Sequence, residues 1–236
     1  MKPSNRGTGA SENEIEVVRH ARARRAKLSF DPASGRARLT LPLRAALKPA
    51  LTWAQGQQDW LAIQRERLPT ARPFVDGAQV PIGDETLTLV CHCDGPRSAR
   101  REGDTLVAGG DEAAFARRIA TWLKSEALAV LSVETAEYAA AAGVKVTQVA
   151  VGDPRGRWGS CAAHGAIRYS WRLILAPAAV RRATVAHEVA HRVHMDHSAA
   201  FHALVADLYG RDPAPERRWL RAHGAALHWI GRSASR

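Results

Sequence analysis

The run His187-Glu188-Val189-Ala190-His191 has two histidines and a glutamate at a spacing that suits metal-dependent hydrolysis. Residues i and i+4 share one face of an α-helix, so on a helix the two imidazoles converge on one ion. Bound zinc lowers the pKa of a coordinated water to about 7 and polarises a carbonyl group. Glu188, beside the first histidine, can take the proton of that water and return it to a leaving amine. The motif predicts a zinc-dependent hydrolase.

An alternative is that both histidines are core residues beside an accidental glutamate. The residues around the motif are small or apolar, as in a buried helix: Ala183, Val185, Ala186, Val189 and Ala190. A glutamate in so apolar a helix would need a partner, because burying an unpaired charge is costly. We therefore expect His187 and His191 to bind a metal and Glu188 to act as general base and acid.

A catalytic zinc needs a third protein ligand, and three later histidines are candidates: His194, His197 and His202. A straight helix would place His194 one turn, about 5 Å, beyond the site. Asp196 and Ser198 look like a helix stop and a new N-cap, which lets the chain turn back and present His197. His202 lies on the helix that follows. We favour His197, so that one zinc ion per chain is held by His187, His191 and His197.

Residues 111–236 hold the elements that must position this site. Asp111 is the expected N-cap of a long helix that runs to about Ala142 and ends at Gly143. Strands are expected over 144–151 and 166–170, with a turn between them. Three helices follow, beginning at Pro177 or Ala178, after Ser198 and at Pro213. This pattern predicts an α+β catalytic domain over residues 111–236.

The preceding residues 15–110 read as a β-rich N-terminal region with one helix pair. A strand, a turn and a second strand are expected over 26–41, followed by helical sequence over 44–67. Short strands separated by glycines are expected from 80 to 107. Residues 1–14 are polar and read as a flexible leader.

The chain is strongly basic. Its formal net charge is +11 over 236 residues, and residues 1–50 hold 11 Lys or Arg against 4 Asp or Glu. This excess favours anionic partners, and nucleic acid is the candidate if five cations form one surface patch: Arg19, Arg22, Arg24, Arg25 and Lys27. Solubility alone would also account for the charge.

Three cysteines do not suggest a disulfide framework, so a reducing, cytoplasmic location is expected. No apolar leader and no uninterrupted apolar run of membrane length is present, which predicts no membrane partner. The triplet Cys91-His92-Cys93 is read as ordinary strand, because successive side chains on a strand face opposite sides.

Several motifs together resemble the YgjP-like metallopeptidase family. They are Arg157-Trp158-Gly159-Ser160-Cys161, Trp171-Arg172-Leu173, the histidine motif, His197-Ser198 with Phe201, and Arg217-Arg218-Trp219-Leu220. The similarity runs from about residue 15 to the end and is densest over 154–204. It implies a zincin-like fold related to the SprT and WLM groups, with His187, His191 and His197 as ligands and Glu188 as acid/base. Where many relatives have a tryptophan, this chain has His202.

The expected fold class is therefore α+β, a zincin-like metallopeptidase domain preceded by a β-rich N-terminal region. The expected function is hydrolysis of peptide bonds in a protein or peptide substrate. Two alternatives stay open. One is a basic nucleic-acid-associated module with a structural or specialised zinc site, including a protease that acts on nucleic-acid-bound protein. The other is a structural zinc closed by a fourth ligand, His194 or His202.

The segment before the histidine motif also has two readings. Arg157 either binds a substrate carboxylate or developing oxyanion, or pairs with an acidic residue of the chain itself. Trp158 and Cys161 either line the cleft or belong to the core.

Overall fold

The computed structural model describes residues 15–92 and 94–233, and the chain falls into two compact units, Met1–Pro69 and Thr70–Arg236. The expected leader over residues 1–14 lies outside the described residues, as does Cys93. Both units mix strands and helices, which confirms the α+β class. Among the residues that the structure describes, no helix has the length and apolar character needed to cross a membrane.

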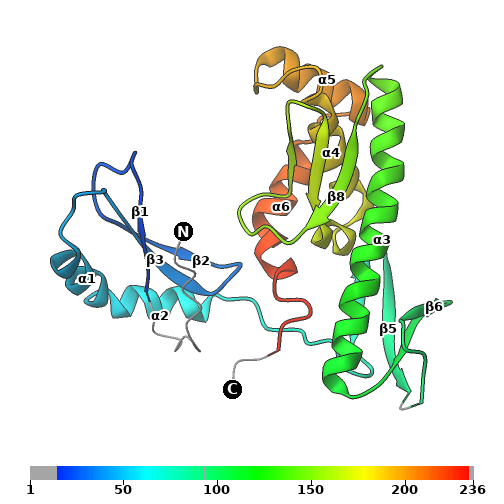
Figure 1. Ribbon diagram of the computed structural model, residues 1–236, viewed down its shortest axis with the longest axis horizontal. Coiled ribbons are helices and arrows are strands. Elements are labelled where there is room, and N and C mark those ends of the chain that lie inside the picture. Colours follow the sequence, from blue (N-terminus) through cyan, green and yellow to red (C-terminus); the bar gives the residue numbers. More distant parts are fainter. Residues whose placement is uncertain (1–14, 93, 234–236) are drawn as a thin grey trace, which may run out of the picture. The chain divides into compact units, whose positions relative to one another are not determined.

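The first unit consists of a three-stranded sheet and two helices (Figure 1). Strands β1 (Glu16–Arg19) and β2 (Lys27–Asp31) flank β3 (Arg36–Leu41), with β1 parallel and β2 antiparallel to it. Helices α1 (Leu47–Gln55) and α2 (Gln58–Glu66) follow. The sheet and α1 share a small core, because Leu39, Leu41 and Ala54 are fully buried together. The expected strand pair and helix pair are confirmed.

The second unit begins with a four-stranded sheet in the order β4-β5-β7-β6. Its strands are β4 (Gln79–Ile82), β5 (Glu85–His92), β6 (Arg100–Glu102) and β7 (Thr105–Gly109). Helix α3 (Glu112–Ala141) follows, and the Asp111 side chain accepts a hydrogen bond from the Ala114 amide at 2.7 Å, as expected of an N-cap.

The division between the units differs from the boundary at residue 110 that the sequence suggested. Leu87, Leu89 and Leu106 of the four-stranded sheet are buried in the same core as Phe115 and Ile119 of α3. Because these side chains form one hydrophobic core, the sheet belongs to the unit that carries the histidine motif. The division between the units therefore falls after Pro69.

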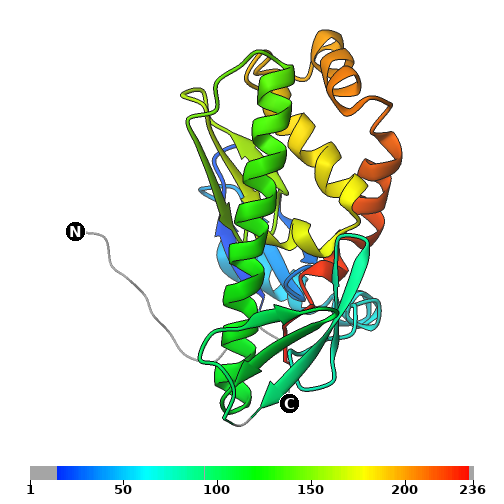
Figure 2. The same ribbon diagram turned by 90° about the vertical axis from the view of Figure 1, so that its right-hand side faces the viewer.

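The remainder of the second unit consists of a three-stranded sheet and four helical segments, of which α4 packs against α3 while the last two helices pack against α4 (Figures 1 and 2). Strand β10 (Ala166–Ser170) lies between β8 (Gln148–Gly152), which is parallel to it, and β9 (Gly159–Cys161), which is antiparallel. A 3₁₀ helix, η1 (Trp171–Leu175), then leads into α4 (Ala178–Ala190), α5 (Ala199–Tyr209) and α6 (Ala214–Leu227). The three helices confirm the expectation, whereas η1 was not anticipated.

Helix α4, which carries the motif, is fixed to α3 by a buried ion pair. Arg181 Nε lies 3.1 Å from both carboxylate oxygens of Glu134, and Nη2 lies 2.9 Å from one of them. Both side chains are at most a tenth exposed. Since removing one partner would leave an uncompensated buried charge, this pair sets the position of α4 against α3.

Candidate metal centre

Three imidazoles meet where α4 ends and α5 begins. The candidate ligand atoms of His187, His191 and His197 all lie within 4.8 Å of one another, and the Nε2 atoms of His187 and His197 are 3.4 Å apart. Two nitrogens bound at about 2.1 Å to a tetrahedral zinc would be about 3.4 Å apart. The structure thus brings together the three histidines that the sequence singled out, in a geometry suited to a metal ion.

The ring of His191 is oriented by a backbone carbonyl. The helix ends at Ala190, and the following turn places the His194 oxygen 3.0 Å from His191 Nδ1. With Nδ1 as the donor, Nε2 keeps its lone pair free for a metal, the arrangement common among ligating histidines. His194 contributes this carbonyl, and its imidazole is not part of the cluster. The straight-helix argument about His194 does not apply, because the helix has already ended.

His197 is presented by the turn that was expected. The Ser198 amide donates to Asp196 Oδ1 at 3.1 Å, and Ser198 Oγ accepts from the Phe201 amide at 3.3 Å. These two bonds hold the backbone on both sides of His197 while α5 starts. The ring of His202 stands 6.3 Å from that of His197, outside the group of three.

The ring of Phe201 packs against all three histidines, a role that the sequence analysis did not assign to it. The ring is fully buried and stacks on His191 with centroids 4.5 Å apart at 26°. It also meets His187 and His197 edge-on, each at 4.9 Å. The sequence feature that could have predicted this role is the position of Phe201 three residues after the Ser198 N-cap. This position lies in the first turn of α5, which packs against α4.

Glu188 is buried beside the imidazoles, with 6% of its surface exposed. Among the described residues, no hydrogen bond or ion pair engages its carboxylate, although the sequence argument asked for a partner. Burial disfavours the charged form and raises the pKa of Glu188 from 4.5 to about 7, although the positive charge of Arg157 acts to lower it. In the absence of a metal ion, the Glu188 carboxyl group therefore keeps its proton to a higher pH than an exposed glutamate does.

Burial favours the neutral, metal-binding form of the His187 and His191 imidazoles. Burial, followed by the nearby charges of His191, His197 and Arg217, lowers the pKa of His187 to about 4. Burial likewise lowers the pKa of His191. Because protons compete with metals for these nitrogens, lowered pKa values favour metal binding at neutral pH.

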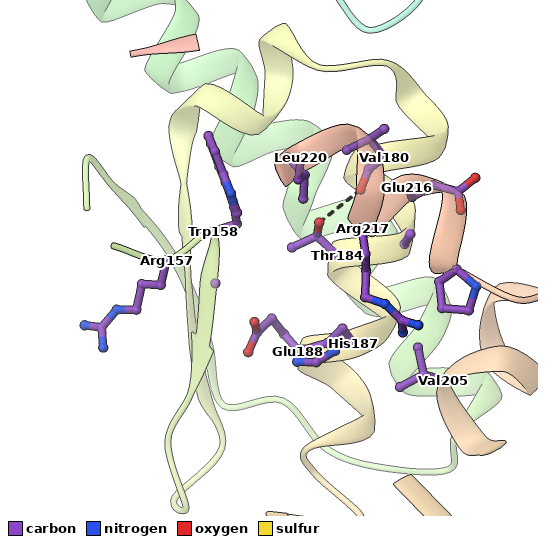
Figure 3. Close-up of a pocket in the computed structure, with 13 residues that line it drawn as sticks. Arg157, Trp158, Val180, Thr184, His187, Glu188, Val205, Glu216, Arg217 and Leu220 are labelled. Atoms are coloured by element: carbon purple, nitrogen blue, oxygen red, sulfur yellow. Dashed lines mark hydrogen bonds between the residues drawn. The ribbon is translucent and has the colours of Figure 1, made fainter. Parts of the chain in front are cut away.

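A cavity of about 280 Å³ opens beside His187 and Glu188 (Figure 3). Its walls come from the residues at and just before the start of β9, from α4, from α5 and from the loop and helix at α6, and most of them are apolar. The lining residues are Arg157, Trp158, Gly159, Val180, Ala183, Thr184, His187, Glu188, Val205, Pro213, Glu216, Arg217 and Leu220. A substrate bound in this cavity would touch the histidine cluster directly.

Residues 157–159 line this cavity, whereas Cys161 of the same segment does not. Arg157 is exposed, and in Figure 3 its guanidinium points away from His187. Among the described residues it forms no ion pair, so the second of the two readings of Arg157, pairing with an acidic residue, is not found there. Trp158 is half-buried, packs against the main core and faces His228 with ring centroids 5.5 Å apart. Cys161 is half-buried against the same core.

Comparison with known families agrees with this geometry. A family model described as "YgjP-like, metallopeptidase domain" matches residues 24–223, which is most of the chain. Neither curated proteins nor solved structures gave a significant match.

Proposed function

The chain belongs to the YgjP-like metallopeptidase family, and from this premise we propose that it is a zinc-dependent peptidase whose metal is held by His187, His191 and His197. The observation that carries the proposal is the convergence of these three imidazoles within 4.8 Å, with a buried glutamate on the adjacent helical position. Three neutral nitrogens form a donor set typical of catalytic zinc, which leaves a fourth position for water or substrate.

The residues present fit such an ion. His187 and His197 offer Nε2 atoms 3.4 Å apart, and His191 Nδ1 is occupied by the His194 carbonyl, which directs its Nε2 to the cluster. When bound, zinc would polarise the scissile carbonyl and acidify a water molecule. A structural site closed by four ligands is less well supported, because the imidazoles of His194 and His202 lie outside the group.

In this proposal Glu188 moves the proton. Its carboxylate takes a proton from the attacking water as the carbon–oxygen bond forms. It then delivers that proton to the amine nitrogen as the carbon–nitrogen bond breaks. A group that acts first as base and then as acid works best with a pKa near the operating pH, and the burial of Glu188 supports this role. Neutral His187 and His191 stay unprotonated throughout.

Metal content and cleavage, measured on the same preparations, test the proposal. Mass spectrometry should find one zinc ion per wild-type chain and none in His191→Ala. Wild type should cleave casein or a peptide library, whereas Glu188→Gln should keep its zinc and lose cleavage. Zinc without Glu188-dependent cleavage would contradict the peptidase, and a chain that takes up no added metal would contradict the site itself.

A second candidate function, nucleic-acid binding by the first unit, is favoured by unpaired cations there. The side chains of Arg22, Arg24, Arg25 and Lys27 are exposed, and none has a hydrogen bond or ion pair among the described residues. Arg19 differs, since its guanidinium donates to three backbone carbonyls, those of Pro42, Leu43 and Ala45. Arg19 keeps its positive charge, but its donors are engaged, so the other four cations are the ones that we propose to contact phosphate groups.

Salt dependence tests this second function. Phosphate contacts release counterions, so affinity for duplex or single-stranded DNA should fall steeply with salt concentration. Replacing all four cations by glutamine should reduce that slope by about 3 to 4. Affinity that does not respond to salt, or a slope unchanged in the variant, would argue against a nucleic-acid partner.

A further inference from the structure

The walls of the cavity beside the histidine cluster suit an apolar side chain. Trp158, Val180, Val205 and Leu220 line it, and its volume of about 280 Å³ lies just below the usual range of small-molecule sites. It can therefore take one or two side chains of a substrate. An apolar group that leaves water here gains about 25 cal/mol per Å² of buried surface.

The indole of Trp158 is a rigid part of this wall. It packs against Gly224 of α6 so closely that a Cβ atom at Gly224 would lie 2.7 Å from Trp158 Cζ2. This close approach places the indole directly against α6, where it forms one wall of the cavity.

The positively charged side chain of Arg217 lines this mostly apolar cavity. Figure 3 shows the side chain extending from α6 towards the His187 side of the cavity. Its ion pair with Asp212 is 3.9 Å long, and the two side chains are 44% and 75% exposed. Such an exposed, long pair contributes little energy, so the guanidinium stays available to a ligand.

The acidic residues of the cavity do not neutralise Arg217. Glu216, the preceding residue, accepts hydrogen bonds from Tyr209 Oη at 3.0 Å and from Arg211. Its carboxylate is thereby directed to the end of α5 and the following loop. Glu188 lies at the far side of the cavity, against Gly159. Arg217 is thus a cation at an apolar cavity with no close anionic partner among the described residues except Asp212.

We propose that this cavity receives an apolar side chain of the substrate and that Arg217 binds a carboxylate of the same substrate. The planar guanidinium can hold a carboxylate with two parallel hydrogen bonds, which a neutral amide cannot reproduce. The inference rests on the proposed peptidase and names its substrate class: peptides that combine an apolar residue with a negative charge near the scissile bond. The charge is either the free α-carboxylate of a chain end or an acidic side chain.

Ligand binding to the full-length chain tests this without relying on turnover. Calorimetry would compare N-acetyl-leucine with N-acetyl-leucinamide, first with a chelator present and then with one equivalent of zinc. A charge-assisted hydrogen bond at a partly exposed arginine favours the acid by about 10-fold. Arg217→Gln should bring the two affinities together, whereas Arg218→Gln, an exposed arginine on the same helix outside the cavity, should preserve the difference.

A second pair of probes identifies the source of the carboxylate. N-acetyl-leucyl-aspartyl amide against its asparaginyl counterpart tests an acidic side chain, and the first pair tests a chain end. Arg217→Lys keeps the charge but not the fork, so it should retain part of the preference and confirm the role in a folded protein.

Equal affinity for acid and amide in wild type, absence of binding by either, or a preference that survives Arg217→Gln would each overturn the proposal. If the carboxylate binds only to added zinc, the preference for the acid will appear only with zinc present and will persist in Arg217→Gln. Because the chelated protein cannot hydrolyse peptides through a metal, failure here is distinguishable from failure of the proposed peptidase, which is judged by Glu188-dependent cleavage.

Discussion

The side chain of Glu188 lies directly against the backbone of Gly159, a residue 29 positions earlier in the chain. A Cβ atom built on Gly159 would stand 2.5 Å from Glu188 Cγ and 2.6 Å from Cδ, and closer still to Oε1. A methyl group at this position would overlap the Glu188 side chain, so only glycine lets that side chain keep its present position beside β9. This contact holds the proposed proton carrier between the strand and the imidazoles.

Gly159→Ala should therefore displace Glu188 while leaving the three histidines in place. We expect about 100-fold loss of peptidase turnover, because a shift of about 1 Å in a reacting group has effects of that size. Zinc content should stay at one per chain. Gly156→Ala is the matched control, since a Cβ there meets nothing within 4 Å. Equal activity of the two variants would show that the Gly159 contact does not position Glu188.

The buried carboxyl of Glu188 should make the metal-free protein less stable as pH rises. The unfolded chain ionises this group near 4.5, whereas the folded chain keeps its proton until about 7. Between these values the unfolded state releases the proton first, so the contribution of Glu188 to the free energy of unfolding falls with increasing pH and levels off above 7. The lowered pKa of His187 acts in the opposite direction, so comparison with a Glu188 variant is needed to isolate this contribution.

Glu188→Gln removes this loss. With a chelator present, the variant should gain stability over wild type progressively from pH 4.5 to 7, by roughly 3 kcal/mol at most, given about 1.4 kcal/mol per pKa unit. Denaturant unfolding at several pH values measures the difference. A difference that stays constant over the whole range would contradict the burial of an uncharged carboxyl.

Substitution of His197 should abolish metal binding, whereas substitution of His202 should not. His197→Ala removes one of the three grouped nitrogens, so stoichiometric zinc should be lost. His202→Ala is the control, because its ring stands 6.3 Å from that of His197 and it belongs to the same helix region. Zinc retained by His197→Ala at one ion per chain would transfer the third position to another residue.

Phe201 should tune zinc affinity without touching the ion. Phe201→Leu keeps an apolar group of similar size but removes the ring that contacts all three imidazoles. Loss of such orienting contacts commonly weakens metal binding by about 10-fold or more. Competition with a chromogenic chelator measures this affinity.

Phe115→Leu, an equally buried change in α3, is the control for general destabilisation. It should lower the free energy of unfolding by a similar amount and leave zinc affinity unchanged. If both variants weaken zinc equally, Phe201 acts only through stability.

The sequence by itself determined the local parts of this protein. The spacing of His187 and His191 follows from the period of the helix, and Ser198 and Asp111 could be read as N-caps because a cap acts within three residues. Most strands and helices followed from apolar periodicity and glycine positions. The choice of His197 also depended on a local turn.

Tertiary structure decided what depends on residues far apart in the chain. Gly159 faces Glu188, and Arg217 reaches the His187 side of the cavity, only because β9 and α6 pack beside α4. The division after Pro69 likewise reflects a core shared by a sheet and a helix that follow one another in sequence. Burial raised the pKa of Glu188, whereas the sequence indicated only that a glutamate in so apolar a helix would need a partner. Burial and packing arise from the whole fold, so no local pattern encodes them.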